Sequence, residues 1–231
     1  MIEELGVDFV VISWWGFYDD YGRFTDEALQ RVFQTAQSIN TTLKFAVMVE
    51  PFNKTGDSYD YNGIYNYVYD TFVEPYLSLY YFDGNKPAIC FFNDKSLTDN
   101  GLFLQDEKSR FNTILVGQQS YTQWIYTNLN FYDLPVHEPR GQISVTPRFD
   151  DSLFRTPPCI VDSNLTEGVY DIEWERAIQL VRERRIDTIM ITSWNEYVER
   201  TEIEPHYDGT TCIHDPAFLY NKTKNYIRQL P

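Results

Sequence analysis

The sequence has few of the residues that build metal centres and redox sites. Its 231 residues include only three cysteines, three histidines and three methionines. The spacing of Cys90, Cys159 and Cys212 matches no zinc motif, and their odd number allows one disulfide without showing which pair would form it. The histidines form no HExxH sequence, and the pattern of His206 and Asp208, which could ligate an ion, is more typical of a solvated loop. We therefore expect no metal ion and no cofactor.

Positive charge and long apolar runs are also scarce. The 19 lysine and arginine residues face 34 aspartate and glutamate residues, which gives a formal net charge of −15. Such a chain repels phosphate backbones and anionic lipid surfaces, so we expect no nucleic acid partner. No run approaches the ~18 apolar residues of a spanning helix, and no signal peptide begins the chain, so we expect no membrane insertion in this segment. Walker, GxGxxG and GxSxG sequences are missing as well.

Sites for N-glycosylation are the only feature that bears on location. Four Asn-x-Ser/Thr sequences begin at Asn40, Asn53, Asn164 and Asn221. In a chain this rich in asparagine, roughly two would arise by chance, so they lean only slightly towards a secretory or extracytoplasmic location.

Apolar and aromatic residues, in contrast, are plentiful. Hydrophobic residues make up 43% of the sequence and aromatic residues 17%, so a sizeable core can form. The aromatic rings could fill this core or stack on the C–H faces of sugars, and composition leaves both readings open. The length suits one α/β domain over residues 1–231.

Short apolar runs alternate with helical patterns along the chain. Helices are expected at 26–40, 61–76, 173–185 and 215–229, and the first has Leu29, Val32, Phe33 and Ala36 on one face. This alternation predicts a parallel sheet with helices outside it. Strands are expected at 7–13, 43–49, 87–92, 112–117, 142–146 and 187–193, with a further candidate at 123–126.

The start of the chain indicates which fold these elements form. The opening MIEELG is typical of a last helical turn that Gly6 terminates. A preceding strand and most of a helix would complete a (β/α)8 TIM-type barrel, of which seven strands are expected here. We therefore expect a single barrel domain that lacks its first βα unit, with a gap between the strands at 7–13 and 187–193.

Polar residues follow the ends of several predicted strands, where a parallel barrel places its chemistry. The densest group lies in SWNEYVERTEIEP, directly after the last strand. A helical turn over 195–201 would bring Glu196 and Glu199 to i and i+3, with Cβ atoms ~5–6 Å apart. Two such carboxyls cannot easily both ionise, so one offers a proton while the other accepts one, as retaining glycoside cleavage requires. Alternatively, both are solvated acids of an acidic loop.

Five segments, in order, resemble motifs of glycoside hydrolase family 99, the endo-α-mannosidase family. SWNEYVERTEIEP is similar to the family's S-F-N-E-W-H-E-G-T-Q-I-E-P, and GVDFVVISWW to its second strand. KFAVMVEPF resembles K-V-x-F-x-I-E-P-Y, which places Glu50 on an active-site glutamate. KPAICFF resembles K-P-L-x-Y-x-Y, and ISVTPRFDDSLFR resembles S-V-x-P-G-Y-x-D-T-x-I-R, which matches Asp151 and Arg155. The resemblance covers nearly the whole chain.

This resemblance implies a metal-independent retaining enzyme that acts on oligosaccharides or polysaccharides of the α-mannoside type. Glu196 would draw the proton from the substrate's 2-hydroxyl, which attacks the anomeric carbon to give a 1,2-anhydro sugar. Glu199 would protonate the leaving oxygen and then act as base for water. The residues expected to bind substrate are Trp14, Trp15, Glu50, Asp94, Asp151, Arg155, Trp194, Asn195, Tyr197 and Glu204.

The sequence also departs from the family pattern. Val198 stands where the family has histidine, and Arg148 and Arg200 stand where it has glycine. Related barrels occur in WbsX-type proteins of polysaccharide synthesis, which gives a glycosyltransferase-associated protein as a second hypothesis. A glycan-binding barrel without turnover is a third, and the intact Glu196 and Glu199 pair argues against it.

Overall fold

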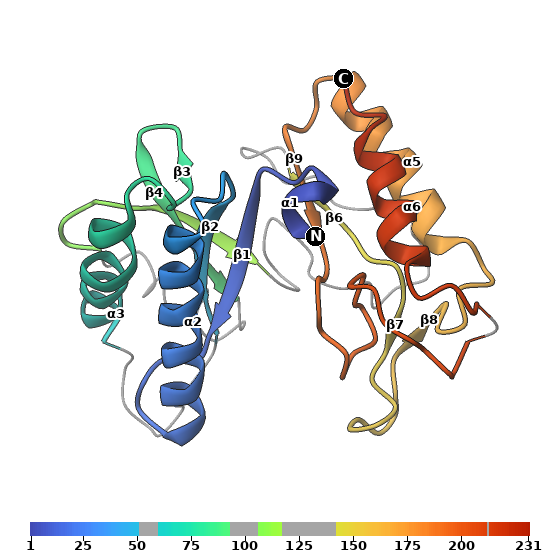
Figure 1. Ribbon diagram of the computed structural model, residues 1–231, viewed down its shortest axis with the longest axis horizontal. Coiled ribbons are helices and arrows are strands. Elements are labelled where there is room, and N and C mark those ends of the chain that lie inside the picture. The colour runs from blue at the N-terminus through green and yellow to red at the C-terminus, as the bar shows by residue number, and fades with distance from the viewer. Residues whose placement is uncertain (51–59, 93–105, 117–141, 212) are drawn as a thin grey trace. The chain divides into compact units, whose positions relative to one another are not determined.

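The computed structural model describes residues 1–50, 60–92, 106–116, 142–211 and 213–231. The chain divides into two compact units, unit 1 (Met1–Gln119) and unit 2 (Ser120–Pro231), and each has its own parallel strands and helices (Figure 1). The assignment of residues 1–231 to a single domain stays a prediction.

A sheet of parallel strands forms the centre of unit 1. The strands pair in parallel in the order β1–β2–β4–β5, and β3 joins β4 in the antiparallel direction. Five of the six residues of β2 are buried, as expected for a strand covered on both faces. The strands are β1 (Phe9–Trp14), β2 (Lys44–Val49), β3 (Phe82–Asp83), β4 (Lys86–Phe92) and β5 (Asn112–Val116).

The helices of unit 1 begin and end where local chemistry dictates. Gly6 closes α1 with a φ of 92°, a left-handed conformation that glycine adopts without steric cost, as predicted. The carboxylate of Asp19 accepts a hydrogen bond from Gly22 N at 2.7 Å and so caps the start of α2. The helical elements are α1 (Ile2–Leu5), α2 (Asp20–Ser38), α3 (Tyr61–Val68), the π-helix η1 (Tyr69–Val73) and the 3-10 turn η2 (Glu74–Tyr76).

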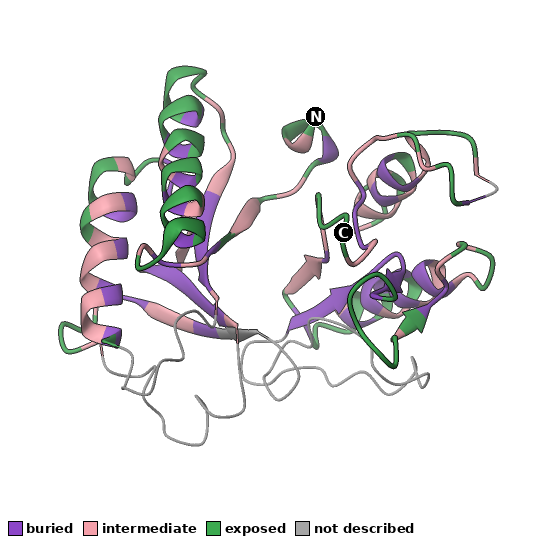
Figure 2. Cartoon of the chain, turned by 90° about the horizontal axis from the view of Figure 1, so that it is seen from below, coloured by how far each residue is buried: buried purple, intermediate pink, exposed green. Residues whose placement is uncertain are grey.

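Helices α2 and α3 pack on one face of this sheet, with their buried residues turned towards the strands (Figures 1 and 2). On α2, Leu29, Phe33 and Ala36 are buried in the core as predicted. Val32 was placed on the same face, but its side chain is 38% exposed. The apolar stripe runs through Leu29, Phe33 and Ala36, so the helical period leaves Val32 at its solvent edge.

Trp14 ends β1 with its indole in the core of unit 1. The side chain has no exposed surface, and its Nε1 donates a hydrogen bond to Asp26 at 2.9 Å. The same carboxylate accepts hydrogen bonds from Tyr67 Oη at 2.7 Å and Gln30 Nε2 at 2.8 Å. Because this buried acid is fully engaged, it fixes the ring. The assignment of Trp14 to substrate binding is corrected, since no face is open to a sugar.

Unit 2 combines a pair of parallel strands with two helices. Strands β6 and β9 pair in parallel, and β7 and β8 pair in the antiparallel direction. Helices α5 and α6 lie side by side (Figure 1), where Trp174 stacks on Tyr226 with 5.4 Å between ring centroids. The elements are β6 (Gln142–Val145), β7 (Phe149–Asp150), β8 (Ile160–Val161), α5 (Val169–Arg182), β9 (Thr188–Ile191) and α6 (Phe218–Ile227).

The predicted parallel strands are confirmed in place and direction. The six apolar runs correspond to β1, β2, β4, β5, β6 and β9, and all pairings among them are parallel. A mixed α/β fold with parallel sheet is therefore shown, whereas closure into a barrel stays a prediction. The antiparallel pairs were not predicted, because two-residue strands carry no pattern. The candidate strand at 123–126 lies outside the described residues.

Across the described ranges, no helix combines the length and the hydropathy that a bilayer crossing requires.

Glu173 is a carboxyl group buried between α5 and the end of β6. Its Oε2 accepts a hydrogen bond from Thr146 N at 2.5 Å, and its Oε1 has no hydrogen-bond partner among the described residues. Burial raises the pKa of Glu173 well above its usual value, and the bond from Thr146 only partly offsets this. The folded protein therefore favours a protonated Glu173.

This burial predicts a loss of stability as the pH rises above the usual titration range of a glutamate. A raised pKa in the folded state contributes stability below the pKa of the unfolded chain, and that contribution disappears as the pH rises through the folded pKa. Glu173→Gln removes the titration, so we expect its melting temperature to decline less, from acidic pH upwards, than that of the wild type. Thermal unfolding across this range measures the effect, with Glu175→Gln, an exposed position on α5, as control. Parallel declines for all three proteins would contradict the assignment.

Candidate active site

The segment 193–205 follows β9 and folds as a closed loop. Ser193 N donates to Thr201 O at 2.9 Å, which brings the two ends together. The helical turn predicted over 195–201 is not formed. Thr201 N donates to Glu196 O, five residues back, at 3.2 Å, whereas an α-helix bonds four residues back, and Arg200 has a φ of 56°. The Ser193 hydroxyl favours this arrangement, since it accepts from Glu196 N at 2.9 Å and bonds to Thr201 Oγ1 at 2.8 Å.

Glu199 and Glu196 meet different environments within this loop. Glu199 is largely buried, with 18% of its side chain exposed, whereas Glu196 is an exposed residue. Burial is the largest cause that raises the pKa of Glu199, and the negative charge of Glu196 raises it further. The pKa of Glu199 is thus shifted in the direction that a proton donor needs. The loop places this group near a second, exposed acidic residue.

Two residues after β7 complete the surroundings of Glu199. Arg155 Nη2 lies 3.9 Å from Glu199 Oε1 and lowers the pKa of Glu199, while Asp151 adds a smaller increase. Arg155 is oriented by Asp151, whose Oδ2 accepts from Arg155 Nη1 at 3.0 Å. Asp151 is fully buried and also accepts from Cys159 N at 2.6 Å. The structure thus brings together four predicted residues, Glu196, Glu199, Asp151 and Arg155.

Arg200 follows Glu199 in sequence, but its guanidinium is held elsewhere. Its Nη2 donates to Asp208 at 3.2 Å and to Thr210 at 2.5 Å, and its Nη1 lies 3.5 Å from Asp150. Burial raises the pKa of Asp150, but hydrogen bonds from Ser152 and the charge of Arg200 outweigh burial and hold this pKa below its usual value. Arg200 is therefore the partner of Asp150 and Asp208, as the assignment of Glu199 as an acid requires.

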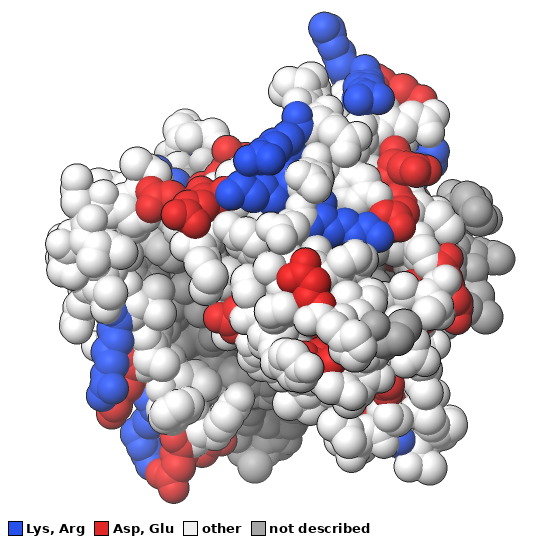
Figure 3. Space-filling view, turned by 45° about the vertical axis from the view of Figure 1, so that its right-hand side comes forward, with Lys and Arg blue, Asp and Glu red and all other residues white. Residues whose placement is uncertain are grey.

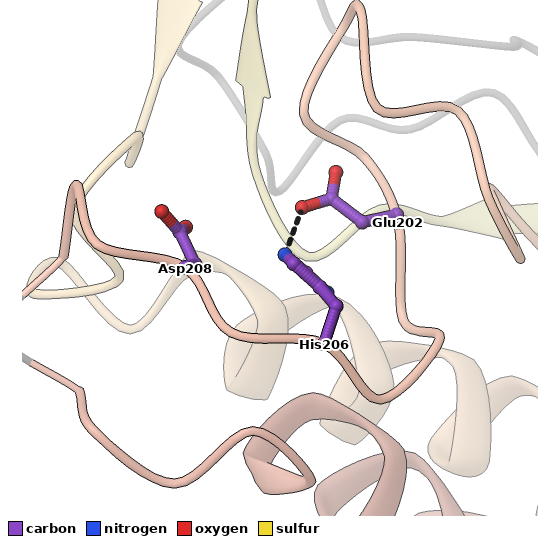
Figure 4. A group of neighbouring side chains, drawn as sticks. All are labelled: Glu202, His206 and Asp208. Carbon is purple, nitrogen blue, oxygen red and sulfur yellow. Dashed lines mark ion pairs between the residues drawn. The ribbon is translucent and has the colours of Figure 1, made fainter.

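Glu202, His206 and Asp208 form a cluster on the same loop (Figure 4). Their potential ligand atoms lie within 4.8 Å of one another, and His206 Nε2 is 3.1 Å from Glu202 Oε1. The guanidinium of Arg148, however, bonds to Glu202 Oε1 at 2.5 Å and to Asp208 Oδ2 at 2.7 Å. A cation already neutralises these carboxylates and would repel a second one. The cluster does not fit a metal ion.

The remaining predicted residues of unit 2 belong to the same segment, 193–205. Trp194 is half-buried, with its ring edge-on to Tyr220, and Asn195 is exposed. Tyr197 is 44% exposed and donates to Glu204 Oε2 at 2.5 Å. A pocket of unit 2 is lined by Glu204, His206, Tyr207 and Phe218 among others, but by neither Glu196 nor Glu199. Solvent-exposed rings thus lie next to the acids in sequence, outside that pocket.

Besides Trp14, three predicted residues belong to unit 1. Trp15 is half-buried, with its ring edge-on to Tyr21 at 5.7 Å between centroids. Glu50 follows β2 and accepts a hydrogen bond from Ser13 Oγ at 2.8 Å. Both lie at the carboxyl end of the parallel sheet, as expected, and their convergence with Glu196 and Glu199 stays a prediction. Asp94 lies outside the described residues.

The face of the molecule drawn in Figure 3 carries charges of both signs. Basic side chains gather in a band there, with acidic side chains beside it, and large areas carry no charge.

A scan of the sequence against models of known protein families finds no match, and a search of curated proteins finds none either. The chemistry of the site therefore has to be argued from its geometry and from the motif resemblance.

The environment of Glu199 predicts opposite shifts for two substitutions. Glu196→Gln removes a neighbouring negative charge, so we expect the pKa of Glu199 to fall. Arg155→Met removes the opposing positive charge, so we expect this pKa to rise. The ¹³C chemical shift of the Glu199 carboxyl, followed by NMR as the pH is varied, measures both. Glu183→Gln, at the end of α5, is the control and should leave the curve unchanged. Shifts of the same sign in both variants would show that the charges do not act as described.

Proposed function

We propose that this protein is a retaining glycoside hydrolase that acts on α-mannoside-type glycans, with Glu199 as acid and Glu196 as base. The observation that carries the proposal is the largely buried Glu199, whose pKa is raised by burial and by the charge of Glu196. A general acid must hold its proton near the working pH, and a pair of carboxyls in unlike environments separates the acid from the base. The motif resemblance supports the substrate class and a (β/α)8 barrel around the site.

The reaction follows from these two roles. Glu196 takes the proton of the substrate's 2-hydroxyl, and the resulting oxygen attacks the anomeric carbon as the glycosidic bond breaks. Glu199 gives its proton to the leaving oxygen, so the leaving group departs as a neutral alcohol. Water then opens the 1,2-anhydro sugar, with Glu199 accepting the proton of the water and Glu196 returning one to the 2-oxygen. Two displacements at the anomeric carbon give overall retention.

The neighbouring residues suit the substrate as well as the acids. Arg155 has 53% of its side chain exposed, which leaves donors available for sugar hydroxyls beside Glu199. The exposed ring of Tyr197 offers a surface on which a pyranose can stack. The negative net charge of the chain favours a neutral glycan over a phosphorylated one.

The two roles predict different responses to the leaving group. Glu199→Gln cannot donate a proton, so we expect kcat/KM for an α-linked mannobioside to fall by roughly 10²- to 10⁴-fold. An aryl α-mannoside with an acidic phenol needs little protonation and should lose much less. Glu196→Gln leaves the 2-hydroxyl protonated, so both substrates should be affected strongly. Steady-state kinetics on the two substrates, with Glu183→Gln as control, measure these ratios.

The outcomes of these assays separate the hypotheses. Equal and small losses from Glu196→Gln and Glu199→Gln would identify both as solvated acids and contradict the proposal. Turnover that requires a nucleotide sugar would instead place the protein with the transferases of polysaccharide synthesis. Glycan binding without turnover in the wild type would indicate a binding protein.

A further inference from the structure

Arg148 is a buried guanidinium that connects three parts of unit 2. Only 1% of its side chain is exposed. Its Nη2 bonds to Glu202 and its Nη1 to Asp208, and these two carboxylates are themselves 3% and 17% exposed. Its Nε donates to the main-chain oxygen of Arg200 at 2.9 Å. Among cationic side chains, only arginine has a planar group with enough N–H donors, on separate nitrogens, to bond to all three acceptors together.

The contact with the main chain of Arg200 lies directly beside Glu199. The peptide oxygen of Glu199 accepts a hydrogen bond from Asp150 N at 2.9 Å, and the next peptide oxygen, that of Arg200, accepts from Arg148. Both donors belong to the segment 148–150 around β7. Two consecutive peptide groups are thereby fixed to one short segment, so the direction in which the Glu199 side chain leaves the backbone is fixed as well.

Arg148 is the guanidinium that Glu202 and Asp208 share, and Arg200 pairs with Asp208 as well. Burial raises the pKa of Asp208, but hydrogen bonds from Thr210 and from Arg148 outweigh burial and keep this pKa below its usual value. Without Arg148, Glu202 would lose its guanidinium partner in a buried place, next to the carboxylate of Asp208. The loop 199–208 would then have to open to hydrate them, and Glu199 lies within this loop.

We propose that Arg148 is a positioning residue that holds Glu199 in its buried place through the Arg200 peptide and the Glu202 and Asp208 carboxylates. The inference rests on the proposed function, since it concerns the geometry of the acid. Arg148 lies in the segment before β7 and has no described contact with the side chain of Glu196 or Glu199. It nevertheless determines how Glu199 meets Glu196, Asp151 and Arg155.

The variant Arg148→Lys tests this role at constant charge. A single ammonium cannot bond to Glu202, Asp208 and the Arg200 oxygen together, so the loop should loosen. We expect kcat to fall by about ten- to a hundred-fold with KM little changed, because misplacement of a catalytic group affects the chemical step. Water should reach Glu199 more easily, so the alkaline limb of the pH dependence of kcat should move to lower pH. Arg185→Lys, whose side chain is 52% exposed, is the matched control.

A second readout needs no substrate. The ¹³C titration of the Glu199 carboxyl in Arg148→Lys should move to lower pH relative to the wild type, while Arg185→Lys should match the wild type. If the wild type shows no hydrolase activity, the proposed function fails, and this titration still decides the role of Arg148. If the wild type is active but the titration of Glu199 is the same in folded Arg148→Lys, the positioning role is overturned.

A purely structural role is distinguished by the same data. In that case kcat would fall only in proportion to the folded fraction, with the alkaline limb unmoved, and this result would also overturn the proposal. Should Arg148→Lys fail to fold, the double variant Arg148→Gln/Glu202→Gln removes one charge of each sign and leaves no buried excess. The displaced titration of Glu199 is expected there too, and an unchanged curve would contradict the inference.

Discussion

Glu199 is a carboxyl group that is largely removed from water and lies near a second acid, and the surrounding structure of unit 2 has to hold it there. Burial already disfavours the charged form of Glu199, and the exposed Glu196 adds its negative charge. Hydration of the Glu199 carboxyl would relieve both effects. The loop after β9 must therefore hold this side chain in its buried position. Two hydrogen bonds serve this requirement, because Asp150 N and the Arg148 guanidinium hold two consecutive peptide oxygens, those of Glu199 and Arg200.

The same constraint explains why Arg200 does not abolish the raised pKa of its neighbour. A guanidinium one residue from an acid would favour the carboxylate if the two side chains met. In this structure Arg200 is drawn to Asp150 and Asp208, and the weaker, longer contact of Arg155 is the only cationic influence described on Glu199. A buried network therefore has two effects, since it positions the loop and keeps a nearby cation away from the acid.

Local sequence patterns predicted the strands and the end of the first helix well. Apolar runs between turn residues identified each parallel strand, and Gly6 identified the end of α1. The errors have local causes: the edge position of Val32, the Ser193 hydroxyl that replaced a helical turn, and the Asp26 carboxylate that draws Trp14 inward. The ion pairs of Arg148 were not predictable, because its carboxylate partners lie more than fifty residues away in sequence. The only signal was an arginine where the resembling family has glycine.

The requirement for a 2-hydroxyl tests the central claim most directly. Two substrates with the same leaving group, an α-mannoside and its 2-deoxy analogue, would be compared, and the first-formed anomer of the product followed by ¹H NMR. Participation by the 2-oxygen predicts cleavage of the mannoside with release of the α-anomer and no cleavage of the 2-deoxy analogue. Comparable cleavage of both substrates, or release of the β-anomer, would contradict the roles assigned to Glu196 and Glu199.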